Sequence, residues 1–407
     1  MTVDEAERLD AADPLAFARE RFTLPDGTIY LDGNSLGALP TSAPAALATT
    51  AEWQWGDDLI SSWNKHQWID WPAQIAARLS PIVGAKANEL VIADSTTVCL
   101  FKLLVAACRA RPDRRKIVTQ KASFPTDLYA TQGVCDMLGL QLNAVAPEEV
   151  PGEIDDQTAV VSLTHVDYKS AAVYDMRGIN DSAHAAGALV LWDLCHSAGA
   201  IEVDLDGTGS DVAVGCGYKY LNGGPGAPAF IYIAERLQDE LTNPLQGWMG
   251  HAEPFAFDDD YWSASGMTQF LTGTPSVLGL AALACGLDTF EGIAMADLQA
   301  KSRALSQLFI DETEARCGSD VRLASPRDPT ARGSHVVFGH PHGYAVMQAL
   351  IARGVIGDFR APDLMRFGFA PLYNSFAEVV LAAELLGEVL ASREWDQPHF
   401  TERKSIT

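Results

Sequence analysis

The chain has 407 residues, of which 48% are hydrophobic and 20% are charged. This composition is typical of a folded globular protein and excludes disordered and collagen-like classes, and the length favours two or more domains. The 53 acidic residues outnumber the 29 basic ones and give a net charge of −24, so a nucleic-acid or anionic-membrane partner is not expected. A saline habitat would explain the acidity equally well.

Residues 1–83 are expected to be mainly helical. The first 20 residues predict a capping helix, and residues 28–40 predict a short strand followed by a glycine-rich turn. Residues 41–83 have a helical pattern with several tryptophans.

An alternation of strands and helices begins near residue 90. Apolar strands are predicted at 89–95, 116–120, 140–147, 158–165, 188–194, 211–216 and 228–234. The first strand leads into a predicted helix at 96–110. Continuous apolar strands separated by helices predict an α/β fold with a mainly parallel, seven-stranded sheet between helices. Ligands in such sheets bind at the carboxyl ends of the strands, so candidate residues are expected there.

A smaller α+β domain is predicted at the C-terminus. A helix near 276–292 leads out of the sheet domain. The rest of the chain contains a helix, a strand at 335–340, a further helix, an apolar segment at 367–375 and an amphipathic helix at 376–391. We therefore expect an N-terminal arm (residues 1–50), a large domain (51–295) and a small domain (296–407).

The seven cysteines are scattered along the chain and form no CxxC pair. Neither a disulfide framework nor a structural zinc site is therefore expected. The opening residues MTVDEAERLD are polar and acidic, unlike a secretory signal, and the apolar run at 277–287 is too short to span a bilayer. These features predict a soluble protein of the reducing cytoplasm.

Two polar side chains follow apolar strands of the predicted sheet. Lys219 lies in GYKYLNGGPG, and a partly desolvated lysine there would be neutral near pH 7 and could form a Schiff base with an aldehyde cofactor. Asp193, in LWDLCHSAGA, would pair with a protonated pyridine nitrogen. The alternatives are a surface lysine, a helix N-cap at Asp193, or a metal pair of Asp193 with His196, for which no further ligand has matching spacing.

Three further segments carry candidate binding residues. The hydroxyl side chains of DSTTVCLFKLL (94–104) stand at a predicted helix N-terminus, which either binds a phosphate or is simply capped. Phe124, in FPTDLYA, is placed either to stack on a flat ring or to join the core. Arg360 and Arg366 flank a turn before an apolar segment, where a guanidinium is expected to hold a carboxylate, either a ligand's or an internal one.

The order of these roles along the chain is more specific than any one of them. A phosphate-binding helix end, a ring-stacking aromatic, a pyridine-binding acid, a Schiff-base lysine and a carboxylate-binding arginine together describe pyridoxal-phosphate enzymes. Such enzymes have a large parallel-sheet domain and a small C-terminal domain. No GxGxxG opens a helix after the first strand and no GxxxxGK[ST] occurs, which disfavours nicotinamide and P-loop nucleotide binding.

Over residues 25–395 the sequence closely resembles the kynureninase family of the aspartate-aminotransferase (fold type I) superfamily. The resemblance rests on YLDGNSLGALP (30–40), FPTDLYA (124–130), LWDLCHSAGA (191–200), GYKYLNGGPGAPAF (217–230) and APLYNSF (370–376). It implies hydrolysis of L-kynurenine to anthranilate and L-alanine in tryptophan catabolism, with pyridoxal 5′-phosphate (PLP) as cofactor.

The resemblance also implies a role for each candidate residue. Lys219 would attach the cofactor, Asp193 would pair with its pyridine nitrogen, and Arg366 would take the substrate α-carboxylate. Tyr218, adjacent to the lysine, would donate a proton during cleavage. The cofactor site would further comprise Thr96, Thr97, Phe124, Asp127, Thr164, His196, Tyr218, Trp248 and Thr274. Trp248 and residue 274 would come from the other subunit of a homodimer.

One residue departs from the pattern of animal members of the family. They carry Asn where this chain has Thr274, before the proline of LTGTPS. Threonine can bond a phosphate, but it offers no amide to a ring hydroxyl, so kynurenine is favoured over 3-hydroxykynurenine. The resemblance assigns no role to Trp63 or His66.

Two other classes of protein remain alternatives. A cysteine desulfurase or selenocysteine lyase shares the fold, but it commonly has His directly before the lysine, where this chain has Tyr218. Such enzymes often also use an activated cysteine on a mobile loop, and nothing around Cys317 suggests activation. The second alternative is a PLP-fold regulator without chemistry, and the intact Lys219, Asp193 and Arg366 argue against it.

Overall fold

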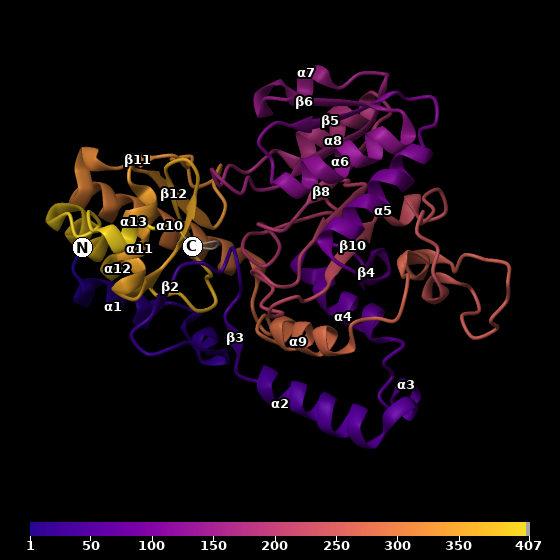
Figure 1. Cartoon of the computed structure of the whole chain (residues 1–407), viewed down its shortest axis with the longest axis horizontal. Helices are drawn as coiled ribbons and strands as arrows, with labels where there is room; N and C mark the ends of the chain where they lie inside the picture. The colour runs from indigo at the N-terminus through magenta and orange to yellow at the C-terminus, as the bar shows by residue number, and fades with distance from the viewer. Residues whose placement is uncertain (404–407) are drawn as a thin grey trace.

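A sheet of seven strands forms the centre of the larger of two lobes in the computed structural model, which describes residues 1–403 (Figure 1). In spatial order the strands are β4 (Leu90–Ala93), β10 (Ala229–Ile233), β9 (Val212–Gly215), β8 (Leu189–Asp193), β7 (Thr158–Thr164), β5 (Lys116–Gln120) and β6 (Gln141–Val145). The predicted α/β class and the predicted seven-stranded, mainly parallel sheet are therefore confirmed.

Strand β10 departs from the predicted parallel arrangement. It pairs antiparallel with β4 and β9, whereas the other pairs of this sheet are parallel. The segment between β9 and β10 contains the glycine-rich turn and no helix. Without a crossover helix the chain turns back directly, and the two strands run in opposite directions.

Helices cover both faces of the sheet (Figure 1). Helix α5 (Thr96–Arg109) belongs to the core on one face, and α6 (Pro125–Leu138) packs against α5. Helices α4 (Trp71–Leu79), α8 (Met176–Ala185) and α9 (Val277–Asp288) belong to the core on the other face. Successive strand residues point to opposite faces, so Val91 and Ile92 enter different cores. This explains why the strands are apolar at every position.

The smaller lobe contains an antiparallel sheet of four strands. Their order is β11 (Arg322–Leu323), β12 (His335–Gly339), β15 (Leu364–Gly368) and β14 (Asp358–Arg360). Helices α10 (Met295–Cys317), α11 (Gly343–Ala352) and α12 (Phe376–Ser392) complete the lobe, and α12 matches the predicted final helix. Arg366 lies within β15, and not before an apolar strand as expected from the sequence.

The N-terminal arm belongs to the smaller lobe. Helix α1 (Val3–Ala12) packs on α12, and β2 (Ile29–Tyr30) pairs in parallel with β13 (Val355–Ile356). The remaining short elements are β1 (Phe22–Thr23), β3 (Leu39–Pro40), α7 (Val150–Glu153) and α13 (Pro398–Thr401). The predicted domain limits at residues 50 and 295 stay a prediction.

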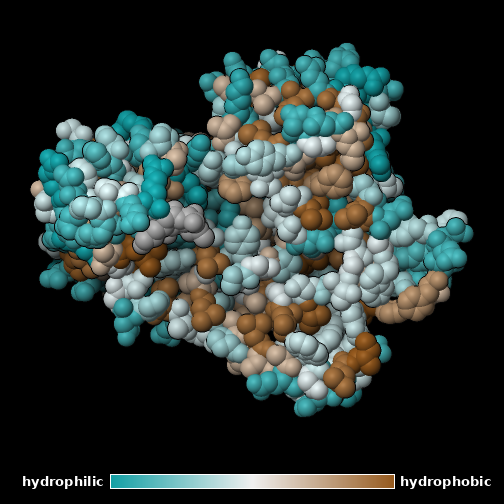
Figure 2. Space-filling view, in the orientation of Figure 1, coloured by the Kyte–Doolittle hydropathy of each residue, from teal (hydrophilic) through white to brown (hydrophobic). Residues whose placement is uncertain are grey.

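The predicted helical region at 41–83 consists of several short helices. Helix α2 (Ala43–Ala48) continues into a π-helical stretch at Thr49–Asp57, and α3 (Ser62–Lys65) precedes α4. Large apolar side chains are exposed here, namely Trp53, Trp55, Leu59 and Ile60. Figure 2 shows apolar surface at this lower end of the molecule. No helix within residues 1–403 is long and apolar enough to cross a bilayer.

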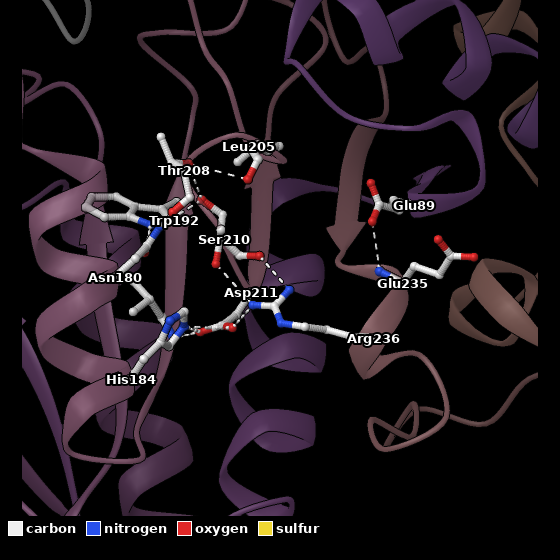
Figure 3. Close-up of polar contacts among 12 residues, drawn as sticks. Glu89, Asn180, His184, Trp192, Leu205, Thr208, Ser210, Asp211, Glu235 and Arg236 are labelled. Atoms are coloured by element: carbon white, nitrogen blue, oxygen red, sulfur yellow. Dashed lines mark hydrogen bonds and ion pairs between the residues drawn. The ribbon is translucent and has the colours of Figure 1, made fainter.

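A buried polar network joins the amino ends of β8 and β9 (Figure 3). Asp211 accepts hydrogen bonds from the Val190 N–H at 2.8 Å, from His184 Nε2 at 2.9 Å and from Arg236 Nη2 at 2.5 Å. Trp192 Nε1 donates to Asn180 at 2.9 Å. Asp211 therefore joins the two strands at the end opposite to Asp193.

Candidate active site

A pocket at the carboxyl ends of β7 and β8 brings together most of the residues predicted from the sequence. Its lining contains Thr96, Thr97, Phe124, Asp127, Thr164, Asp193, His196, Tyr218 and Lys219, all of which were predicted, together with Thr126, Tyr168 and Cys195. Like the predicted residues, the three additional residues come after strands of the large sheet. Tyr168 comes shortly after β7 and Cys195 shortly after β8, so a systematic search of the strand ends would have found them.

Lys219 is buried at the centre of this pocket. Its Nζ donates to His196 Nε2 at 3.0 Å and lies 5.7 Å from the centroid of the Phe124 ring. Burial and the nearby Lys219 lower the pKa of His196 well below its ordinary value, so the imidazole is neutral and can accept this bond. The surface-lysine alternative is thereby excluded, because Lys219 is only 9% exposed.

The charges around Lys219 oppose the expected neutral form of its amine in the cofactor-free chain. Burial alone would lower the pKa of Lys219, but the acidic groups around it, Cys216 and Cys195 first and then Tyr218 and Asp193, raise that pKa above its ordinary value. A ring of acids favours the ammonium form. A neutral amine therefore requires that neighbouring acids such as Asp193 be engaged by another cation.

The loop that carries Lys219 packs against the glycine-rich turn of the N-terminal arm. The Gly37 N–H donates to the Tyr218 carbonyl at 2.9 Å. A Cβ atom on Gly37 would lie 2.3 Å from the Lys219 carbonyl oxygen, so only glycine allows this approach. The YLDGNSLG segment therefore supports the backbone of the lysine loop.

Two carboxyl groups lie side by side at the floor of the pocket. Asp193 Oδ1 accepts from the Cys195 N–H at 2.7 Å in a turn, and no helix begins there, so the N-cap alternative is wrong. Asp127 accepts from Ser123 at 3.0 Å. Burial and the charge of Asp193 raise the pKa of Asp127 well above its ordinary value. Asp127 therefore favours its protonated form next to Asp193.

The pocket has the features that PLP requires. Asp127 Oδ1 and His196 Nδ1 are buried without a hydrogen-bond partner, and such groups are costly unless a ligand engages them. Thr96 and Thr97, the first two residues of helix α5, line the pocket, and the Ser95 side chain does not cap this helix end. Phe124 is 40% exposed, so it is not a core residue; its ring packs edge-on against Tyr168, with centroids 5.3 Å apart, at the pocket where it could cover a flat heteroaromatic ligand.

Arg366 is engaged in an internal ion pair on β15. Its Nε donates to Asp358 Oδ1 at 2.8 Å, and its Nη2 also bonds to Asp358. Its Nη1 donates to the carbonyl of Tyr168, a pocket residue, at 2.8 Å. The alternative of an internal salt bridge therefore holds in this structure. The contact with Tyr168 also places Arg366 next to the lysine pocket.

Comparisons with known proteins identify the family. Residues 298–386 match the model of the kynureninase C-terminal domain. A kynureninase of Pseudomonas fluorescens is 49% identical over 414 aligned positions that cover both chains completely, and one of Burkholderia mallei is 46% identical with the same coverage. The chain belongs to the kynureninase family. The expected family and the expected enzyme class, a PLP-dependent hydrolase, are confirmed.

Solved structures support the fold of this kynureninase-family chain. A cysteine desulfurase from Thermococcus onnurineus NA1 superposes with a TM-score of 0.78 at 20% identity, covering 93% of this chain and 98% of that one. The lyase C-DES, with glycine covalently linked to its PLP cofactor, superposes with a TM-score of 0.79 at 18% identity, covering 90% and 98%. These likenesses confirm the PLP fold type I architecture. The desulfurase alternative is not favoured, because the full-length relatives at 46–49% identity are kynureninases.

Trp248 and Thr274, predicted for the cofactor site of this family member, do not line the lysine pocket of their own chain. Trp248 is 37% exposed and packs edge-on against Trp63, with ring centroids 6.3 Å apart. Thr274 lies in a separate pocket with Asp94 and Gly226. His66, which has no predicted role, bonds to Asp58 at 2.8 Å.

Proposed function

We propose that the chain hydrolyses L-kynurenine to anthranilate and L-alanine with PLP bound in the lysine pocket. The observation that carries the proposal is the placement of Lys219, Asp193, His196 and Phe124 around one buried space in a member of the kynureninase family. When bound, PLP supplies an aldehyde for attachment to an amine and a ring that accepts electrons from the substrate Cα.

In this proposal the side chains that line the lysine pocket each have one role. Asp193 would hold the pyridine nitrogen of bound PLP, and this engagement would remove one of the acids that stabilise the Lys219 ammonium form. His196 Nε2 keeps the lysine Nζ directed into the pocket. Lys219 Nζ would take the α-proton of the substrate, and Phe124 would cover the cofactor ring.

Tyr218 is proposed as the proton donor for the substrate Cβ, which becomes the methyl carbon of alanine. Water adds to the γ-carbonyl, the Cβ–Cγ bond breaks, the acyl part leaves as anthranilate, and Cβ takes a proton. Burial raises the pKa of Tyr218 to about 12, so the phenol is protonated at neutral pH and can donate.

We further infer a homodimer with shared sites. Trp248 and Thr274 lie away from the Lys219 of their own chain, which supports their predicted contribution to the partner's site. L-Kynurenine is the proposed preferred substrate, because Thr274 lacks an amide for a ring hydroxyl. The proposed setting is tryptophan catabolism in the cytoplasm, and seven free, buried cysteines support a reducing compartment.

The proposal is tested with purified protein reconstituted with PLP. We expect an absorbance band near ~420 nm, the region where protonated PLP imines absorb, and the appearance of anthranilate fluorescence on addition of L-kynurenine. L-Cysteine serves as the control substrate for desulfurase activity. Release of sulfide from cysteine without anthranilate from kynurenine would contradict the proposal.

A further inference from the structure

A buried histidine of the small lobe, His335, lies next to the lysine pocket. It is the first residue of β12 and is fully buried. Its ring centroid lies 5.6 Å from that of the pocket residue His196, and the two ring planes are inclined at 54°. His196 in turn accepts the hydrogen bond from Lys219 Nζ. His335 is therefore only one side chain away from the lysine, although it belongs to the other lobe.

The chain just before β12 is held against the large lobe. The Gly333 N–H donates to the Ala171 carbonyl, beyond β7, at 2.8 Å. The hydroxyl of Tyr220, the residue that follows the pocket lysine, donates to the Ser334 carbonyl at 3.1 Å. These bonds fix the backbone next to His335 relative to the lysine loop, so a rigid part of the fold presents its side chain to the site.

The contact with Lys219 decides which nitrogen of His196 carries the proton. Burial and the charge of Lys219 lower the pKa of His196 well below its ordinary value, so the ring is neutral and has one N–H. Because Lys219 donates to Nε2, that proton is on Nδ1. Within residues 1–403 this Nδ1 is buried and has no hydrogen-bond partner. A buried N–H without an acceptor is costly, so an acceptor next to it is expected.

His335 is the side chain placed to be this acceptor. Burial and the charge of Arg366 lower the pKa of His335 well below its ordinary value, so one of its ring nitrogens has a free lone pair. In the described part of the chain, neither of these nitrogens has a hydrogen-bond partner. A centroid separation of 5.6 Å brings an N–H···N bond to His196 within reach after a small rotation of either ring. The bond satisfies one buried nitrogen on each histidine.

We propose that His335 is a positioning residue that accepts the Nδ1–H of His196 and thereby keeps the Nε2 lone pair of His196 directed at Lys219 Nζ. Without this acceptor the His196 proton moves to Nε2 in part of the molecules, where it faces the lysine and leaves no lone pair for it. The lysine amine is then less well directed at the substrate Cα. This inference rests on the proposed function, in which Lys219 takes the α-proton.

The kinetic test compares PLP-loaded wild type with His335→Phe, His335→Asn and His335→Gln. Phenylalanine keeps a flat ring but accepts no N–H, so kcat for L-kynurenine should fall about tenfold or more while KM changes less than about twofold. The amide oxygen lies near the position of Nδ1 in Asn and of Nε2 in Gln, so one of these variants should recover kcat to within about threefold of wild type. A wild-type kcat in His335→Phe, or no recovery by either amide, would contradict the proposal.

His340→Phe is the matched control. His340 is a buried histidine just past the other end of β12, and its ring packs against Trp395 and not against the pocket. This variant should keep kcat within about twofold of wild type. Adding His335→Phe to His196→Gln should lower kcat no further, because His335 acts through His196. Additive losses in variants that circular dichroism shows to be folded would mean an independent, structural role and would overturn the proposal.

A second measurement needs no turnover. In the full chain labelled with ¹⁵N-histidine, the protonated and unprotonated nitrogens of a neutral imidazole give separate NMR signals, and His196→Gln identifies those of His196. Wild type should show His196 protonated at Nδ1, and His335→Phe should shift its signals toward a mixture of tautomers. If wild type cleaves no kynurenine, the proposed function fails, and this spectrum still decides the role of His335. Unchanged His196 signals in His335→Phe, or in His335→Leu if the phenylalanine variant does not fold, would refute it.

Discussion

Replacing Arg366 by methionine is expected to destabilise the small lobe strongly. Methionine fills a similar volume but removes the charge and all the guanidinium donors. Asp358 would lose its two bonds from Arg366, and the Tyr168 carbonyl and Ser35 would each lose a donor. Asp358 is 1% exposed, so water cannot replace these bonds without opening the structure.

The expected loss in the free energy of unfolding depends on the hydrogen-bond donors that Asp358 keeps in the variant. Removing one member of a buried ion pair usually costs about 3–5 kcal/mol, because the other charge stays buried. In this chain Arg360 and Ser35 still donate to Asp358, each at 2.7–2.8 Å, so we expect the lower end, about 3 kcal/mol. Arg322→Met removes an exposed pair and should cost less than about 1 kcal/mol.

The assay is urea unfolding followed by tryptophan fluorescence without added PLP, so that cofactor binding does not shift the equilibrium. Burial would raise the pKa of Asp358, but the charge and hydrogen bonds of Arg366 hold it below its ordinary value. The stability contributed by this depressed pKa is present above the unfolded pKa, about 4, and is lost as the pH falls below that value. Asp358 therefore contributes the same cost at pH 6 and pH 8. Arg366 also lowers the pKa of Asp32, which is about 7, so Arg366→Met should cost more at pH 8, where Asp32 is ionised, than at pH 6. A cost below about 1 kcal/mol, equal to that of the Arg322 control, would refute the buried-pair reasoning.

Four further outcomes are expected. Lys219→Ala should abolish the absorbance band near ~420 nm, and borohydride reduction of wild type should label Lys219; a label on another lysine contradicts the assignment. Asp193→Asn should keep PLP bound but lower kcat by several orders of magnitude, each tenfold step being about 1.4 kcal/mol. Near-normal turnover with bound cofactor would exclude the pairing of Asp193 with the pyridine nitrogen. Thr274→Asn should shift the ratio of kcat/KM values toward 3-hydroxykynurenine, whereas a tenfold wild-type preference for that substrate would rule out the Thr274 argument. Burial and the charge of Asp358 raise the pKa of Asp32 to about 7. Because Asp32 becomes an anion near the arginines as the pH rises through 7, kcat/KM should fall over that range. Asp32→Asn should remove this decrease from the pH profile.

Most of the pocket could be predicted because its residues follow a local rule. Lys219, Asp193 and Thr164 each come at or just after the end of an apolar strand, and parallel strands bring such ends together whatever the exact order of the sheet. The direction of β10 could not be predicted in this way. A buried strand is apolar at every position, so its composition is the same in either direction.

The protonation state of Lys219 and the register of the small sheet were not accessible from local sequence. The lysine was expected to be neutral because burial disfavours charge, but the acids that oppose this effect come from other segments, such as Cys195 and Asp193. Likewise, nothing in the sequence near Arg366 indicates that β14 places Asp358 directly opposite it. Both properties depend on contacts between residues that are separated in the sequence.

The arginines show why a motif has to be checked against the hydrogen bonds that it makes. An arginine in an apolar strand needs a carboxylate, and the sequence alone leaves open whether a ligand or the protein provides it. In this structure Asp358 occupies the two-donor edge of Arg366, so a substrate carboxylate would either displace Asp358 or use other donors. Displacement would leave Asp358 with Arg360 as its only arginine partner, at a cost similar to that of Arg366→Met.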